Sequence, residues 1–342
     1  MTGVVPGVGY YVHHVGRGHL HRAGSIAAEL ARDGVEVTGL STLPEPAGWP
    51  GPWVQLARDD EDVDAARDAV TAGGRLHWVP RHAAGLRDRM ATISAWIGAT
   101  APRAMVVDVS VEVCLLARLH GVPVVSAVLP GVRDDDPHLL GADVADALLA
   151  FWPAEATALG MVRPASLAER VTAVGGLARY AVAEPAPRRP GAPRVTYLAG
   201  SGGHELDPVL LAEARRETPD WEWSVLGGTA PWVDDPRSAI AEADVVVTHA
   251  GQNALAEVAA LRRPCVVVPQ DRPHDEQRTT ARLLDAGPWP AIARETFPVT
   301  GWSALLDEAR ALDGAAWAGW CDDGAAARAA AVVRRVVDEG TG

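Results

Sequence analysis

Short apolar runs rich in β-branched residues alternate along the chain with helical patterns of about 10 to 15 residues. Such alternation is typical of βαβ units, in which a helix crosses over between two parallel strands, so it predicts an α/β fold with parallel sheets. In the first half it predicts helices at Leu20–Arg32 and Val111–His120, and strands at Gly9–His13, Val35–Leu40, Met105–Asp108 and Val124–Val128. The segment Pro44–Ala101 follows neither pattern.

A proline- and arginine-rich stretch, Glu184–Pro193, interrupts the alternation, and its fixed proline φ angles favour a semi-rigid linker. Predicted strands follow at Arg194–Ala199, Glu222–Leu226, Val245–Thr248 and Cys265–Val268. The length of 342 residues also favours two cores, because single cores stop growing near about 250 to 300 residues. We therefore predict two Rossmann-like domains over residues 1–183 and 194–323, a linker over 184–193, and a C-terminal helical segment over 324–342.

The composition excludes several kinds of chemistry. All 31 basic residues are arginine, so no Schiff-base lysine or P-loop lysine exists. The net charge of −13 opposes binding to nucleic acid, and no nucleic-acid partner is predicted. The three cysteines have no CxxC spacing, which argues against a disulfide framework or a cysteine-based zinc site. No apolar run approaches 18 residues and no signal peptide is evident, so we expect no membrane span and a cytoplasmic location.

A candidate anion site lies in the second half, where the segment Val245–Glu257 runs from a strand through a glycine turn into a helix. The first N–H groups of a helix lack partners and point toward the positive end of the helix dipole, which suits a phosphate. His249 and Asn253 are polar side chains near this turn, and Glu257 follows Asn253 by four residues on the same helix face. A carboxylate there suits the two adjacent hydroxyls of a ribose.

A second glycine turn, Gly200-Ser201-Gly202-Gly203, follows another predicted strand and again precedes a helix. Ligands of open α/β sheets bind beyond the carboxyl ends of the strands, where both turns belong. A single glycine turn at a strand end is common in proteins without any binding role, but the presence of two such turns favours a binding site.

The run His249-Ala250-Gly251-Gln252-Asn253, followed by Glu257, Pro264, Pro269 and Glu276-Gln277, resembles the donor-binding signature of the GT-B nucleotide-sugar glycosyltransferases. It is similar both to the UDP-glycosyltransferases and to the peptidoglycan N-acetylglucosaminyltransferase group, over roughly Arg194–Ala286. Two departures are Ala254, where a hydroxyl residue is common, and three extra residues between Pro269 and Glu276.

The resemblance implies two Rossmann-like domains that face a cleft, and no cofactor beyond a nucleoside-diphosphate sugar as co-substrate. It implies that His249, Gly251 and Asn253 hold the diphosphate and that Glu257 holds the ribose. We also expect donor contacts from Gly18, Gln252 and the turn at Gly200, Ser201 and Gly202. The resemblance also implies that Trp232 and Val233 pack the nucleobase and that Glu276 and Gln277 reach the transferred sugar.

The catalytic candidates lie in the first half, where the strand Gly9–His13 leads to Gly18-His19 at the start of a helix. A histidine is neutral or charged near pH 7 and suits the deprotonation of an attacking hydroxyl. Asp108 ends a parallel strand at the same sheet edge and could orient the ring. We predict His19 and Asp108 as the catalytic pair, and the family resemblance of Gly18-His19 and Val106-Val107-Asp108 agrees.

Other histidines and acids invite plainer interpretations. His13, His14 and His21 could line the cleft, and His274 could touch the sugar or begin a helix. These histidines lack HExxH spacing and no DxD pair ends a strand, so no metal site is expected. Asp134-Asp135-Asp136 is interpreted as a solvated loop. Trp49, Trp53, Trp78 and Trp96 suit stacking on an acceptor, or packing in the core.

The sequence thus predicts an inverting, metal-independent glycosyltransferase that moves a sugar from a UDP- or dTDP-sugar to a hydroxyl of a small-molecule or lipid-linked acceptor. Two alternatives remain at this point. One is a nucleotide-sugar epimerase or hydrolase of the same fold, for which Glu205, Asp271 and Asp275 would be the carboxylates. The other is a non-catalytic donor-binding subunit. The oligomeric state is left open.

Overall fold

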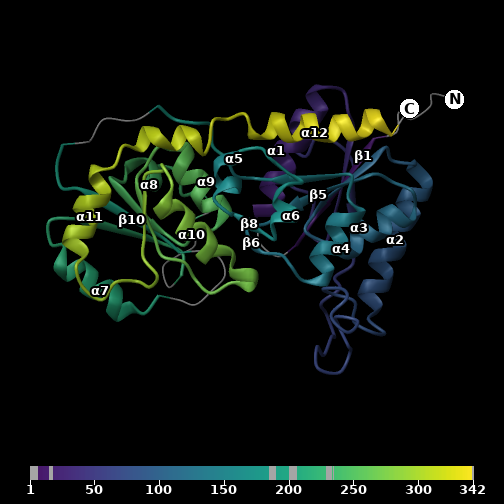
Figure 1. Cartoon of the computed structure of the whole chain (residues 1–342), viewed down its shortest axis with the longest axis horizontal. Helices are drawn as coiled ribbons and strands as arrows, with labels where there is room; N and C mark the ends of the chain where they lie inside the picture. The colour runs from purple at the N-terminus through teal and green to yellow at the C-terminus, as the bar shows by residue number, and fades with distance from the viewer. Residues whose placement is uncertain are drawn as a thin grey trace.

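The computed structural model of the chain describes residues 7–14, 18–184, 190–199, 206–228, 233 and 235–340. Within these residues the chain forms two parallel sheets that lie side by side, one in each half of the sequence (Figure 1). The first sheet has the strand order β3-β2-β1-β4-β5-β7-β9, and the second has the order β11-β10-β12-β13-β14. This architecture confirms the predicted α/β class with parallel sheets.

The strands of the first sheet are β1 (Val8–Val12), β2 (Val37–Ser41), β3 (Trp53–Gln55), β4 (Ala104–Asp108), β5 (Val124–Val128), β7 (Ala147–Ala150) and β9 (Val171–Ala173). Those of the second are β10 (Arg194–Leu198), β11 (Glu222–Leu226), β12 (Val245–Thr248), β13 (Cys265–Val267) and β14 (Ala291–Ala293). A small ribbon pairs β6 (Gly131–Val132) with β8 (Val162–Arg163).

The helices of the first half are α1 (Gly18–Arg32), α2 (Ala84–Thr100), α3 (Val111–Leu119), α4 (Asp136–Val144), α5 (Ala154–Ala158) and α6 (Ala165–Ala168). Those of the second are α7 (Pro208–Glu217), α8 (Arg237–Glu242), α9 (Gln252–Ala260), α10 (Glu276–Ala286), α11 (Trp302–Ala311) and α12 (Ala325–Glu339). Two 3-10 segments are η1 (Pro273–Asp275) and η2 (Gly314–Gly319).

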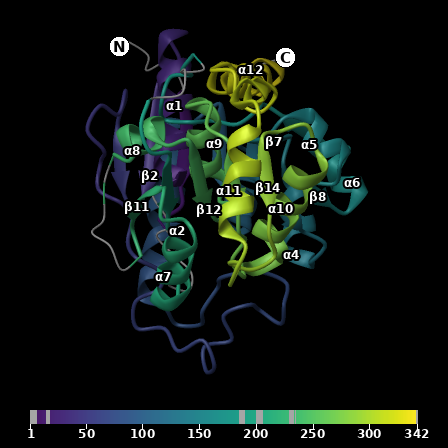
Figure 2. The ribbon, with the colours of Figure 1, turned by 90° about the vertical axis from the view of Figure 1, so that its left-hand side faces the viewer.

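Helices cover both faces of the first sheet. Ile26 and Leu30 of α1 share one core with Val333 and Val336 of α12, and Ile93 of α2 belongs to a core with α3 on the opposite face. The C-terminal helix α12 therefore packs back on the first domain, beside α1 (Figure 2). The C-terminal helix is thus part of the first domain in space, although it follows the second domain in sequence.

The second sheet is covered by α7 and α11 on one face, while α8, α9 and α10 belong to the core on the other. That second core continues into the first domain, because Trp152 and Met161 pack in the same cluster as Leu255 and Leu284. The backbone N–H of Ala183 donates to the carbonyl of Ala260, so the end of the first domain also joins α9 directly. The two domains therefore share one core cluster, and the end of α9 lies on their contact.

The predicted boundary at Glu184–Pro193 falls between β9 and β10, and its residues 185–189 lie outside the described part of the chain. Val124–Val128, Glu222–Leu226 and Val245–Thr248 form strands with the predicted bounds. Across the described residues, no helix combines the length and apolar character that a membrane span requires.

Candidate active site

His19 and Asp108 meet at the carboxyl edge of the first sheet. Strands β1 and β4 are parallel neighbours with Val12 paired to Asp108, so the end of β4 lies beside the start of α1, which carries His19 in its first turn. The Nδ1 atom of His19 lies 3.0 Å from Oδ1 of Asp108. The predicted pair is thus in contact, with the Asp108 side chain fully buried and that of His19 16% exposed.

Arg22 clamps the same carboxylate, and sequence reasoning missed it. Its Nε donates to Oδ2 of Asp108 at 2.9 Å and its Nη2 donates to Oδ1 at 2.7 Å. The guanidinium also stacks on the ring of Phe151, with 4.5 Å to the centroid. Its role could have been inferred from its position, because Arg22 follows His19 by three residues and so lies on the same face of the helix.

These contacts fix the charge of Asp108 and the tautomer of His19. Burial alone would raise the pKa of Asp108, but the Arg22 guanidinium and His19 hold it well below its usual range. Nη2 of Arg22 also lies 3.0 Å from Nδ1 of His19. Both atoms already have Asp108 as an acceptor, so we assign the proton of His19 to Nδ1. Nε2 is then left with a lone pair, as a general base requires.

The start of α9 in the second domain lies directly against the start of α1. A Cβ atom placed on Gly18 would come within 1.6 Å of Nδ2 of Asn253, so this approach requires glycine at position 18. Gly251 caps α9 without a side-chain hydrogen bond, and a Cβ there would meet its nearest atom only at 3.8 Å. The start of α9 thus carries no side-chain cap, and the space around Gly251 leaves room for an anion at this helix end.

Gln252 supplies a further donor at this helix start. Its Nε2 is buried and has no hydrogen-bond partner among the described residues. An unpaired buried donor costs roughly 1 to 3 kcal/mol, which a bound anion would recover. The position suits the predicted contact of Gln252 with a diphosphate.

His249 is bonded on both sides of its ring inside the second domain. Nδ1 lies 2.9 Å from the carbonyl oxygen of Val268, and Nε2 lies 2.9 Å from the hydroxyl of Tyr197. Nδ1 therefore donates to the carbonyl and Nε2 accepts from the hydroxyl, and burial lowers the pKa of this ring. A contact from this side chain to a phosphate would require one of these bonds to break.

Glu257 is paired with Arg179, a residue that sequence reasoning did not single out. Nε of Arg179 donates to Oε1 at 2.5 Å and Nη2 donates to Oε2 at 3.2 Å. Burial raises the pKa of Glu257, and Arg179 counteracts this shift. The next residue, Tyr180, donates its hydroxyl to Asp235 at 2.7 Å. The predicted ribose carboxylate is thus held by the segment that leads out of the first domain.

Glu276 begins α10 and faces the first domain. Its Oε2 lies 3.6 Å from Nη2 of Arg133, and burial raises its pKa while Arg133 and His19 lower it. The neighbouring Gln277 instead turns inward, where its Oε1 accepts from the backbone N–H of Gln270 at 2.8 Å. Of the two residues predicted to contact the sugar, Glu276 lies near Arg133 of the first domain, and Gln277 holds the loop that precedes α10.

The remaining predicted donor contacts are only partly described. Gly200, Ser201, Gly202 and Trp232 lie outside the described residues. Val233 is 38% exposed. Their roles stay predictions.

A pocket of about 310 Å³ lies in the first domain, near the predicted pair His19 and Asp108. Its lining includes Tyr11, His13, His14, Trp78 and Met90. The ring of His13 lies 5.6 Å from that of His19, which connects the pocket to the candidate base. Nδ1 of His14 is buried and, among the described residues, has no hydrogen-bond partner.

The tryptophans of this region have different surroundings, and stacking on an acceptor stays a prediction. Trp78 lines the pocket, as an acceptor contact would. Trp49 and Trp53 stack edge to face at 5.0 Å beside the first sheet, which is core packing.

The interpretation of Asp134–Asp136 as a solvated loop is wrong for Asp135. Its carboxylate caps α4 by accepting the backbone N–H of His138 at 3.0 Å, and it lies 2.7 Å from Nδ1 of that residue. Hydrogen bonds from His138 and His77 lower the pKa of Asp135 to about 2 against the effect of burial. Burial in turn lowers the pKa of His138 to about 4.

Comparison with known proteins defines the class of fold. The glycosyltransferase of kitacinnamycin superposes with a TM-score of 0.68 at 18% identity, over 97% of this chain and all of that one. CalG4, the calicheamicin glycosyltransferase, gives 0.64 at 18% identity over 98% and 99% of the two chains, and Acinetobacter baumannii MurG gives 0.62 at 16% over 96% and 100%. The chain has the GT-B fold, as the sequence resemblance implied.

Sequence comparison places part of the chain more narrowly. Residues 223–286 match the glycosyltransferase family 28 C-terminal domain. A relative at 34% identity is the UDP-N-acetylglucosamine--N-acetylmuramyl-(pentapeptide) pyrophosphoryl-undecaprenol N-acetylglucosamine transferase of Sorangium cellulosum (strain So ce56). That match covers 46% of this chain and 43% of the relative, so it spans less than half of either protein. The second domain is thus related to glycosyltransferases in sequence as well as in fold.

Proposed function

We propose that this protein is an inverting, metal-independent glycosyltransferase that moves a sugar from a nucleoside-diphosphate donor to a hydroxyl of an acceptor. The observation that carries the proposal is the contact between Gly18 and Asn253, which brings the His19–Asp108 pair against the free N–H groups of α9. This contact supports the proposal that the base and the anion site act together across the domain contact. The family 28 match over residues 223–286 supports the assignment of the donor to the second domain.

In the proposed reaction, Nε2 of His19 accepts the proton of the acceptor hydroxyl while the oxygen attacks the anomeric carbon of the donor sugar. The bond from that carbon to the diphosphate oxygen breaks, and its electron pair leaves with the diphosphate. The N–H groups at the start of α9 and the amide of Gln252 stabilise the charge that develops on the leaving group. Attack opposite the leaving group inverts the anomeric configuration.

The charge of Asp108 stabilises the imidazolium that forms on His19. Arg22 keeps this carboxylate ionised, so the acquired proton remains on the ring until product leaves. None of these steps uses a metal ion, because the helix start and the amides act on the diphosphate directly. The nucleotide proposed for the donor is UDP or dTDP.

The proposed acceptor is a small molecule whose reacting hydroxyl points to His19 from the 310 Å³ pocket. Tyr11, Trp78 and Met90 offer apolar faces for a ring system, and Nδ1 of His14 offers a polar contact. Natural-product glycosyltransferases are among the structural neighbours, whereas the Sorangium relative is named for a lipid-linked acceptor. A lipid-linked acceptor is therefore the alternative. The predicted cytoplasmic location stays a prediction.

The test combines product analysis with a variant of the base. The native chain, incubated with UDP- or dTDP-sugars and a panel of phenolic and polyketide acceptors, should give a product of inverted anomeric configuration in the presence of a chelator. His19→Gln should lower kcat by about 10² to 10⁴ while the thermal shift caused by UDP or dTDP is kept. Full transfer by His19→Gln, or a product of retained configuration, would refute the mechanism.

Incubation with the donor alone separates the two alternative functions. An epimerase or hydrolase would change the sugar without an acceptor, and a binding subunit would give no product with any acceptor. Of the carboxylates considered for the first alternative, Asp271 is exposed and bonded to Arg278 at 2.6 Å, and Glu205 lies outside the described residues. No described contact favours either alternative over transfer.

A further inference from the structure

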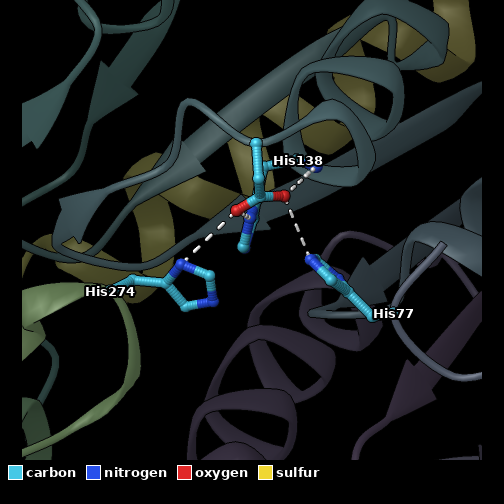
Figure 3. Close-up of side chains that lie close together, drawn as sticks. His77, His138 and His274 are labelled. Atoms are coloured by element: carbon cyan, nitrogen blue, oxygen red, sulfur yellow. Dashed lines mark hydrogen bonds and ion pairs between the residues drawn. The ribbon is translucent and has the colours of Figure 1, made fainter. Parts of the chain in front are cut away.

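Three histidines surround the carboxylate of Asp135 at a place outside the catalytic pair (Figure 3). Nε2 of His77 lies 3.2 Å from Oδ1, while Nδ1 of His138 and Nδ1 of His274 lie 2.7 Å and 3.4 Å from Oδ2. The four potential ligand atoms, one from each residue, all lie within 4.8 Å of one another. Each side chain is half-buried, so the cluster is reachable from solvent without being part of an open surface.

The four residues come from both domains. His77 belongs to the segment between β3 and α2, and Asp135 and His138 form the first turn of α4. His274 belongs to η1 in the second domain, on the loop that leads to α10. Figure 3 shows the ring of His274 approaching from that separate ribbon. The cluster therefore spans the contact between the domains.

The backbone holds His274 in this place. His274 and Asp275 have φ angles of 61° and 59°, which are left-handed values that a residue other than glycine adopts at a cost. A Cβ atom on Gly131 of β6 would lie 2.1 Å from the carbonyl oxygen of His274, so the two backbones touch. An unfavourable conformation kept by close packing indicates that the position of His274 matters to the molecule.

Three imidazole nitrogens and one carboxylate oxygen are a ligand set typical of Zn²⁺. With metal–ligand distances of about 2.0 to 2.1 Å, neighbouring ligands of a tetrahedral ion lie roughly 3.4 Å apart, close to the separations from Asp135 observed here. Mg²⁺ and Ca²⁺ prefer oxygen ligands and would gain little from three imidazoles.

Arg133 opposes a metal ion at this place. Its Nη1 lies 3.2 Å from Nε2 of His138, so that nitrogen accepts a hydrogen bond from the guanidinium. A metal bound at Nδ1 would leave the proton on Nε2, and the two donors would repel each other. Arg133 would have to turn toward Glu276, whose Oε2 already lies 3.6 Å from its Nη2.

We propose that His77, Asp135, His138 and His274 bind one transition-metal dication of the zinc class, which ties the loop before α10 to the first domain. The ion acts as a structural clamp: it belongs neither to the His19–Asp108 pair nor to the start of α9. It fixes the position of Glu276, two residues after His274, at the edge of the cleft. This proposal departs from the sequence expectation that the chain binds no metal ion. It leaves the proposed metal-independent transfer unchanged.

The test measures binding directly on the full chain after removal of metal with a chelator. Titration with ZnCl2 against a chromophoric competitor should give one site per chain, and CoCl2 should give the visible absorption bands of tetrahedral cobalt. His274→Asn removes the imidazole from the second domain while keeping a residue that tolerates the left-handed backbone. This variant should weaken Zn²⁺ binding by at least about 100-fold, since even loss of an outer-shell partner costs 10- to 100-fold.

His120→Asn is the matched control, because His120 contacts Ser94 on α2 and shares no partner with the cluster. It should bind Zn²⁺ as the native chain does. Asp135→Asn should behave like His274→Asn and lose the tetrahedral cobalt bands. Equal Zn²⁺ affinity of native and His274→Asn chains, absence of a saturable site, or equal binding of MgCl2 would each overturn the proposal. These readouts need no sugar donor, so they do not depend on the proposed transferase activity.

Discussion

Asn253 of the second domain lies so close to Gly18 of the first that a Cβ atom at position 18 would fall 1.6 Å from its Nδ2. The side chain of Asn253 at the start of α9 thus packs directly against the backbone at the start of α1. Because the proposed base follows Gly18 directly and the proposed anion site precedes Asn253 directly, this one contact sets the distance between the two halves of the reaction.

Gly18→Ala should therefore damage transfer more than folding. The added methyl group displaces the Asn253 side chain, a flexible end that can rotate, so we expect the free energy of unfolding to change by less than about 1 kcal/mol. The value of kcat/KM should fall by about 10-fold or more, because reacting groups displaced by an ångström lose catalysis steeply. Steady-state kinetics and urea unfolding of the same samples measure both quantities.

Gly24→Ala is the control for this change, since Gly24 lies in the same helix and a Cβ there meets nothing within 4 Å. It should leave kcat/KM unchanged. A double-mutant cycle with Asn253→Ala adds a stricter test: in that background Gly18→Ala should have little further effect. Independent effects of the two changes would contradict a direct contact.

Asp108→Asn should separate catalysis from stability when compared with His19→Gln. Both variants should lower kcat by about 10² to 10⁴, because one removes the base and the other removes the charge that orients it. Only Asp108→Asn leaves the buried Arg22 guanidinium without its carboxylate, which should cost about 3 to 5 kcal/mol of unfolding free energy. Kinetics together with denaturant unfolding would show the difference, and equal stability of the two variants would argue against the Arg22 clamp.

The elements that were predicted from sequence are those with local periodicity. Val124–Val128 is apolar except for Ser126, and Val245–Thr248 is apolar up to Thr248; both form central strands. The contact between His19 and Asp108 was predictable for a related reason: adjacent parallel strands end at one edge, so residues 89 positions apart are brought together. The three-residue strand β3, Trp53–Gln55, was missed because it is too short to show a period.

The residues that were missed are defined by partners distant in sequence. Arg179 is held by its hydrogen bond to Glu257, and Arg133 lies near Glu276. The sequence around each arginine contains no pattern from which these contacts could be predicted. Asp135 was interpreted as solvated because an acidic run usually is, whereas the fold brings His77 and His274 to it from two other segments. Contacts of this kind depend on packing between elements, which periodicity does not report.

Glu257→Gln and Arg179→Ala should distinguish a ribose contact from a purely structural ion pair. If Glu257 receives the ribose hydroxyls, loss of its charge should raise KM for the donor by about 10- to 100-fold with little change in kcat, as expected for charge-assisted hydrogen bonds worth about 1.5 to 3 kcal/mol. Arg179→Ala should raise the same KM less, since the carboxylate remains but loses its orienting partner. An unchanged KM in Glu257→Gln would assign the pair to structure alone.

Acid should weaken folding in two steps, the first of which involves His13. Burial, with His19 and His14 nearby, lowers the pKa of His13 to about 4 in the folded chain, against about 6.5 for an unfolded histidine. Between these values the unfolded chain binds a proton that the folded chain does not, so stability falls as the pH falls from about 6.5 to 4. Asp108, with its depressed pKa, adds a second loss below about pH 4.

The His13→Asn variant isolates the first step, because asparagine does not titrate. The unfolding free energy of the native chain should be lower at pH 4.5 than at pH 7. His13 should contribute at most about 3 kcal/mol of that loss. In His13→Asn this contribution should be absent, so the variant should lose less stability than the native chain. His120→Asn, an exposed histidine at the end of α3, should retain the native dependence. Urea unfolding at the two pH values measures the difference. If His13→Asn kept the full pH dependence of the native chain, the pKa of His13 would be the same in the folded and unfolded chains. That result would contradict the lowered pKa expected from burial beside two other histidines.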